Sequence, residues 1–226
     1  MIQHEAKIFL SAQRPKTELS WFRSFHSFNY ADLYKQPIGS LKVLNDNTLS
    51  AGKGLKTQIK KSTEVLIIPL VGGVEFKNST GYHDFLETGK VQIFLAQAGT
   101  EYEVFNPYET ELINYLEVLI EKEQVIETST TSAIIDTEKC NELLLVFYSP
   151  QQDALVSFGK YWGREEGVYQ RHFGKSSMYF FVIEGAFEID NKLMEARDGL
   201  AIFDAEEIEF EALSNNAMFL IFEIPA

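Results

Sequence analysis

The chain of 226 residues has one cysteine and four histidines. The single Cys140 excludes an intramolecular disulfide and any cysteine-based zinc site, which fits a reducing compartment. A histidine-built metal site would have to be assembled from the four histidines alone. The longest apolar runs, 65–71 and 143–148, are far shorter than the roughly 20 residues that a membrane-spanning helix needs.

Basic residues are also scarce, because 20 Lys and Arg stand against 33 Asp and Glu, for a formal net charge of −13. Phosphate binding requires clustered Lys and Arg, so a direct nucleic-acid partner and an anionic membrane surface are both disfavoured. The polar N-terminal residues lack the pattern of a secretion signal. We therefore expect a cytoplasmic protein that contacts neither membrane nor nucleic acid.

Aromatic residues are abundant, with 18 Phe and 10 Tyr, and they favour strands over helices. Short apolar runs bounded by Gly, Asn, Asp and Pro recur along the whole chain, and helical periodicity is found only weakly at 29–35. This pattern predicts an all-β sandwich or barrel. The predicted strands are 41–45, 64–70, 73–77, 90–95, 112–120, 143–148, 155–161, 167–173, 178–183, 186–190, 199–203, 208–213 and 217–224.

The two halves of the chain repeat one pattern of apolar strand, glycine turn and second strand. Residues 64–76 read EVLIIPLVGGVEF, and residues 178–189 read MYFFVIEGAFEI in the same order. The polar, Ser/Thr-rich stretch 121–137 between them is typical of a loop and is interpreted as the linker. We therefore predict two domains, 1–125 and 126–226.

One stretch near the C-terminus alternates acidic and apolar residues. In 207–212, Glu207, Glu209 and Glu211 fall on one face of a strand, and the apolar residues fall on the other. We interpret the acidic face as a solvated outer surface, and an anion-repelling binding face is the alternative.

Several motifs resemble the pirin-like bicupins, a family of the cupin superfamily. FNYADLY (28–34) and GSLKVLND (39–46) are similar to the family's "SFxxADYY" and "LRVLNDD" segments, and AGKG (51–54) is similar to its "PGxG" turn. In the second half, DGLAIFD (198–204) is similar to the "DGLAIWDE" strand of bacterial members. The resemblance spans nearly the whole chain.

The resemblance implies two tandem jelly-roll barrels, with an Fe-type metal held by three His and one Glu in the N-terminal barrel. Several members of the family are quercetin dioxygenases, and eukaryotic relatives are linked to transcriptional regulation. Three His and a carboxylate suit divalent iron with positions left open for substrate or oxygen. That chemistry depends on the presence of the ligands.

The four ligand positions are all replaced in this chain. Where the family reads "HPHRxxE", residues 58–64 read QIKKSTE, so that Gln58 and Lys60 take the histidine positions. Where it reads "HSEFNP", residues 102–107 read YEVFNP, so that the other two positions become Tyr102 and Val104. An ammonium has no lone pair for a metal and Val104 has no donor at all, so we expect no metal cofactor.

Lys60 raises two alternatives that the sequence leaves open. Its ammonium either replaces the charge of the metal, paired with Glu64, Glu103 or both, or reaches solvent with its stem along the barrel mouth. The histidines do not form a site in the sequence, because they are far apart: His4, His26, His83 and His172.

Three functional hypotheses follow. The first is a bicupin without its metal ligands that binds a small molecule or a protein partner without redox catalysis. The second is a quercetin 2,3-dioxygenase-like oxidoreductase with an altered metal site, built from Gln58, Glu64, Tyr102 and Glu103. The third is a metal-independent acid–base enzyme that uses Lys60 with Glu64 or Glu103. We favour the first, which leaves enzymatic activity open and leans against it.

Overall fold

The computed structural model describes residues 4–149 and 154–225, and these residues form an almost exclusively β-strand protein. Within these ranges the one helical element is a single 3-10 turn, η1 (Ser11–Gln13). The all-β class with two cupin barrels is therefore confirmed. Every strand predicted from the sequence corresponds to a strand of the structure. None of the described residues forms a helix that is long and apolar enough to cross a membrane.

Contacts within the chain define two compact units, each with its own core. The first comprises Pro15–Asn29 and Ser40–Ile134, and we call it the N-terminal barrel. The second, the C-terminal barrel, comprises the described parts of Met1–Arg14, Tyr30–Gly39 and Ile135–Ala226. The division of the chain at 125/126 stays a prediction.

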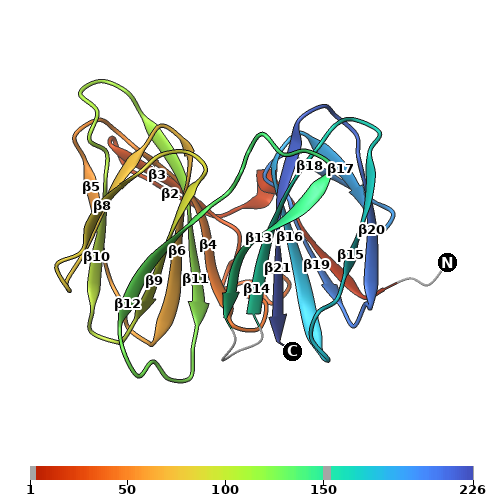
Figure 1. Cartoon of the computed structure of the whole chain (residues 1–226), viewed down its shortest axis with the longest axis horizontal. Coiled ribbons are helices and arrows are strands. Elements are labelled where there is room, and N and C mark those ends of the chain that lie inside the picture. The colour runs from red at the N-terminus through yellow and green to blue at the C-terminus, as the bar shows by residue number, and fades with distance from the viewer. Residues whose placement is uncertain (1–3, 150–153, 226) are drawn as a thin grey trace. The chain divides into compact units, whose positions relative to one another are not determined.

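The N-terminal barrel consists of two sheets (Figure 1). The larger sheet has the order β12-β9-β6-β11-β4-β3-β2: β12 (Ser129–Ile134), β9 (Lys90–Ala96), β6 (Thr63–Val71), β11 (Ile113–Glu121), β4 (Leu41–Leu49), β3 (Phe22–His26) and β2 (Lys16–Glu18). The smaller sheet has the order β5-β10-β7-β8: β5 (Gly54–Gln58), β10 (Glu101–Phe105), β7 (Val74–Asn78) and β8 (His83–Leu86). Apolar side chains from both sheets meet in one core.

The C-terminal barrel has the same construction. Its larger sheet has the order β1-β19-β16-β21-β14-β13: β1 (Ala6–Phe9), β19 (Gly199–Phe203), β16 (Ser176–Glu184), β21 (Ala217–Pro225), β14 (Ala154–Tyr161) and β13 (Glu142–Ser149). Its smaller sheet has the order β15-β20-β17-β18: β15 (Glu166–Gln170), β20 (Glu207–Ala212), β17 (Ala186–Ile189) and β18 (Lys192–Glu195). The strand order thus repeats between the two units, as the internal repeat predicts.

The edge strand of each large sheet comes from a distant part of the sequence. β12 follows the other strands of the N-terminal barrel in the chain and pairs antiparallel with β9, so that Thr131 lies opposite Ile93. β1 precedes all other strands and pairs with β19, with Ala6 opposite Ile202. The two strands occupy the same place in the two sheets, beside β9 and β19 respectively.

Two predictions of local structure are wrong. The linker 121–137 contains β12, whose Ser and Thr side chains lie on an edge strand that is largely exposed and therefore shows no apolar alternation. The segment 29–35 forms turns and no helix. There, the Asp32 carboxylate accepts the backbone N–H of Tyr34 at 2.9 Å, a local bond that competes with helix formation.

Candidate functional site

The interior of the N-terminal barrel is filled around two of the replaced ligand positions. Tyr102 and Val104 lie two residues apart on β10 and therefore on the same face of the strand. They are 2% and 1% exposed. The Tyr102 ring stacks on Phe76 with centroids 5.9 Å apart and meets Phe94 edge to face at 6.3 Å. Val104 lies opposite Phe76 in the strand register. Aromatic packing therefore occupies the region that Tyr102 and Val104 face.

The Tyr102 hydroxyl is bound to a buried carboxylate. It donates to Oε1 of Glu117 at 2.7 Å, and Glu117, on β11, is 6% exposed. Burial and the negative charge of Glu117 hold the pKa of Tyr102 well above its ordinary value, so the phenol remains a donor. The other oxygen of Glu117 accepts from the Asn45 amide at 3.0 Å, and Asn45 Oδ1 in turn lies 2.8 Å from Nδ1 of His26.

This hydrogen-bonded chain fixes the tautomer of His26. Since Asn45 donates to Glu117 through its amide nitrogen, Asn45 Oδ1 has to accept, and His26 Nδ1 carries the hydrogen. His26 Nε2 then accepts from the Thr17 hydroxyl at 3.0 Å. Both nitrogens of His26 are thus committed to structural bonds.

Gln58 and Lys60 lie outside this core. Both are exposed, whereas Ile59 between them is 2% exposed and belongs to the barrel core. Thr57 is the residue of β5 that lies opposite Tyr102 in the register. Successive side chains of an extended segment point to opposite sides, so Gln58 and Lys60 point away from Tyr102.

The two expected charge partners lie apart from Lys60 as well. Glu64 lies on β6 and faces away from the core, to which its neighbour Val65 belongs. Oε1 of Glu64 accepts a hydrogen bond from Lys122 Nζ at 2.6 Å. The side chains of this ion pair are 7% and 2% exposed. Glu103 is half-buried and lies in register with Lys56 on β5 and Lys77 on β7.

These residues do not fit the metal that the family resemblance implies. Val104 offers no donor, and the Tyr102 hydroxyl is bound to Glu117. Gln58 and Lys60 point away, and Glu64 is bound to Lys122. Over residues 4–149 and 154–225, no three His, Cys, Asp or Glu side chains are grouped as a metal site would require. Nor do Gln58, Glu64, Tyr102 and Glu103 converge on one point.

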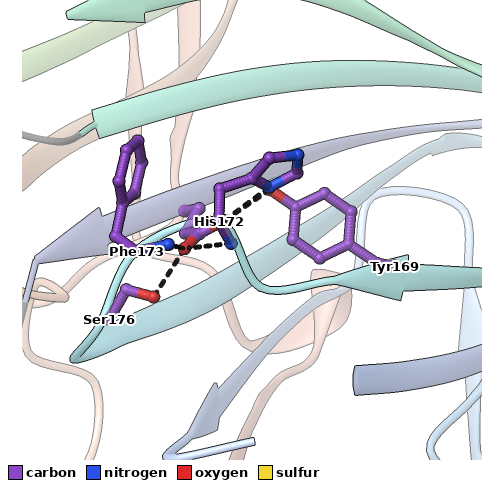
Figure 2. A network of polar contacts seen from close by, with 5 residues as sticks. Tyr169, His172, Phe173 and Ser176 are labelled. Carbon is purple, nitrogen blue, oxygen red and sulfur yellow. Dashed lines mark hydrogen bonds and ion pairs between the residues drawn. The ribbon is translucent and has the colours of Figure 1, made fainter. Parts of the chain in front are cut away.

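The C-terminal barrel contains a second polar cluster, built on Glu223 (Figure 2). Glu223 lies on β21 with no exposed surface, beside Phe219 and Ile221 of the barrel core. Its carboxylate accepts from the Tyr169 hydroxyl at 2.9 Å and from the Ser176 hydroxyl at 2.7 Å. It also accepts from three N–H groups that the loop between β15 and β16 supplies.

Those three donors come from adjacent residues. The backbone N–H of Phe173 lies 2.9 Å from Glu223 Oε1, the backbone N–H of His172 lies 3.0 Å from both oxygens, and His172 Nδ1 lies 3.1 Å from Oε2. Burial by itself would raise the pKa of Glu223. The hydrogen bonds from Ser176 and from the backbone of His172 and Phe173 lower it below the ordinary value. Glu223 is therefore an ionised, rigidly held carboxylate.

A groove of about 1030 Å³ lies on the smaller sheet of the C-terminal barrel. Glu207, Glu209 and Glu211 of β20 point into it. The residues that alternate with them, Ile208, Phe210 and Ala212, point toward the core. The outward-facing acidic side of this strand is as predicted. The acidic residues that line the groove are Glu166, Glu188, Asp190, Asp204, Glu206, Glu207, Glu209 and Glu211.

Comparison with known proteins identifies the family. Residues 9–120 match the model of the pirin family, and residues 149–224 match that of the quercetinase C-terminal cupin domain. The chain belongs to the pirin-like cupin family. The resemblance drawn from the sequence motifs is thereby confirmed.

Three of the proteins similar to this pirin-like bicupin match it over nearly their whole length. A quercetin 2,3-dioxygenase of Escherichia coli K12 is 26% identical over 226 residues, which cover 94% of this chain and 96% of the relative. The crystal structure of Escherichia coli YhhW superposes with a TM-score of 0.86 at 24% identity, covering 98% of each chain. The bacterial pirin YhhW in complex with nickel(II) gives the same TM-score at 23% identity, covering 98% of this chain and 99% of that one.

Sequence reasoning missed the Glu223 cluster in this pirin-like bicupin. Its members are distant in sequence, since Tyr169 and His172 lie near residue 170 and Glu223 lies on the last strand. One signal was available, because Glu223 interrupts the apolar run 217–224 of a strand that is otherwise buried. A charged residue in such a strand indicates a buried partner.

Proposed function

We propose that this pirin-like bicupin works without a metal in its N-terminal barrel and binds a small molecule or a protein partner without redox catalysis. The observation that supports this is the state of Tyr102, which is buried in an aromatic cluster with its hydroxyl bound to Glu117. A divalent metal there would have to displace that packing and would find Val104 as a neighbour. We further propose a cytoplasmic location and no direct nucleic-acid contact, in keeping with the net charge of −13.

The test is metal analysis of the full chain purified from medium supplemented with iron, manganese and nickel. We expect less than about 0.1 metal ion per chain, because the donor set offers neither three imidazoles nor a free carboxylate. The Escherichia coli relative, purified in parallel, serves as the control for loading. Near-stoichiometric metal that is lost in Tyr102→Phe would contradict the proposal.

A second candidate function is that of a quercetin 2,3-dioxygenase with an altered metal site. It is favoured by the name of the 26% identical relative and by the nickel(II) complex of bacterial pirin YhhW. The two functions are separated by oxygen uptake with quercetin under metal supplementation. A flat trace supports the first function, whereas quercetin-dependent uptake that requires metal supports the second.

A further inference from the structure

His172 differs from the other three histidines in the contacts of its ring nitrogens or, in the case of His4, in its exposure. His172 Nδ1 faces Glu223, whereas no hydrogen bond or ion pair joins its Nε2 to a described residue, and its side chain is 50% exposed. His26 uses both nitrogens in structural bonds, and His83 has its carboxylate contact, to Glu75 at 3.4 Å, on Nε2. His4 places Nδ1 3.2 Å from Asp190 and is only 21% exposed.

The carboxylate of Glu223 fixes the tautomer of His172. An ionised carboxylate only accepts hydrogen bonds, so the hydrogen of the neutral imidazole lies on Nδ1. Nε2 then carries the free lone pair, on a side chain that is 50% exposed. Such a pair of buried carboxylate and oriented imidazole is the arrangement in which histidine acts as a base or nucleophile.

The orientation of the imidazole is held from several sides. The His172 ring lies 5.4 Å from the Tyr169 ring and 6.4 Å from the Phe173 ring, measured between centroids. Its backbone N–H is bound to the same carboxylate as its side chain. Tyr169 and Ser176 hold Glu223 in turn, so the lone pair of Nε2 has a fixed direction.

We propose that His172 is the catalytic residue of a second site, on the C-terminal barrel, which hydrolyses small neutral acyl esters. His172 Nε2 attacks the carbonyl carbon, and the leaving alkoxide or phenoxide departs with its bonding electrons. The Nδ1 proton stays hydrogen-bonded to Glu223, whose charge balances the acyl-imidazolium. Water then attacks the acyl carbon, which releases the carboxylic acid and the neutral imidazole, and the proton that is left over goes through solvent to the departed alkoxide or phenoxide. The net charge of −13 disfavours anionic esters.

The first experiment uses p-nitrophenyl acetate, a small neutral ester, with the full chain at pH 7.5. We expect nitrophenolate release to fall at least about fivefold in His172→Gln, because the nucleophile is removed. His83→Gln is the matched control, since it removes an equally exposed histidine, and its rate should equal that of the parent. An unchanged rate in His172→Gln with a native circular dichroism spectrum would overturn the proposal.

The second experiment separates the positioning role of Glu223 from a structural one. Long-range ¹H–¹⁵N spectra of the ¹⁵N-histidine-labelled chain should show neutral His172 protonated at Nδ1. Finding neutral His172 protonated at Nε2 would overturn the proposal. This measurement uses the parent chain, so it does not depend on whether any variant folds. In Glu223→Gln, if folded, the rate should fall toward that of His172→Gln, and in Glu223→Asp it should recover in part. A Glu223→Gln protein that is folded and fully active would equally contradict the role of Glu223.

Discussion

Glu223→Gln tests most directly whether the buried carboxylate holds the C-terminal barrel together. Each oxygen of Glu223 accepts at least three hydrogen bonds, and every partner is a donor. Glutamine carries no charge and replaces one acceptor oxygen by a donor nitrogen, so at least two of the charge-assisted bonds are lost. Hydrogen bonds to charged groups contribute about 1.5–3 kcal/mol each, so the free energy of unfolding should fall by about 3–6 kcal/mol. This is a large share of the total stability of a typical domain.

The pH dependence of the loss follows from the lowered pKa of Glu223. A carboxyl whose pKa is depressed in the folded state adds stability above its unfolded value, about 4.3. That stability is lost as the pH falls through the lower, folded-state pKa. The difference between parent and Glu223→Gln should therefore be full at pH 7 and shrink well below pH 4.

Urea denaturation at pH 7 and pH 3 measures this difference. Trp162 lies in the C-terminal barrel and Trp21 in the N-terminal one, so a Trp21→Phe background assigns the fluorescence change to the unit that carries Glu223. Glu209→Gln, an exposed change on the same barrel, is the control and should cost less than about 0.5 kcal/mol. Equal midpoints for Glu223→Gln and Glu209→Gln, or a loss independent of pH, would refute the reasoning.

Three further substitutions test the N-terminal barrel by urea denaturation. Tyr102→Phe leaves a buried oxygen of Glu117 without its hydroxyl partner and should cost about 1.5–3 kcal/mol; an effect below 0.5 would count against that bond. Lys122→Met leaves the Glu64 carboxylate buried without its cation and should cost about 3–5 kcal/mol, most of which Glu64→Gln in the same chain should restore. Lys60→Ala should change stability by less than about 0.5 kcal/mol, since the side chain is exposed; a larger loss would mean that it has a buried partner.

Strand positions were predictable because they depend on local patterns. Apolar runs between turn residues mark a strand wherever it pairs, and each predicted run overlaps a strand of the structure. β12 was missed because its side chains are polar on both faces and its identity as a strand depends on pairing with β9. A pairing partner distant in sequence leaves no local signature.

The candidate site was harder to predict, because it depends on which face of a strand points inward. The family pattern placed Gln58 and Lys60 at ligand positions, whereas Ile59 between them is the buried residue. The polar–apolar–polar alternation of 58–60 agrees with the burial of Ile59 alone. The pairing of Glu64 with Lys122 joins residues far apart in sequence and follows only from the fold.

The position of β1 has a consequence for how the protein is made. β1 leaves the ribosome long before its partner β19, because Ala6 pairs with Ile202, which is 196 residues later in the chain. At translation rates of about 5–20 residues per second, β1 waits about 10–40 seconds for β19 to be synthesised. During this interval its unpaired edge is open to strands of other nascent chains. The C-terminal barrel therefore completes its larger sheet only after β19 and β21 have been translated.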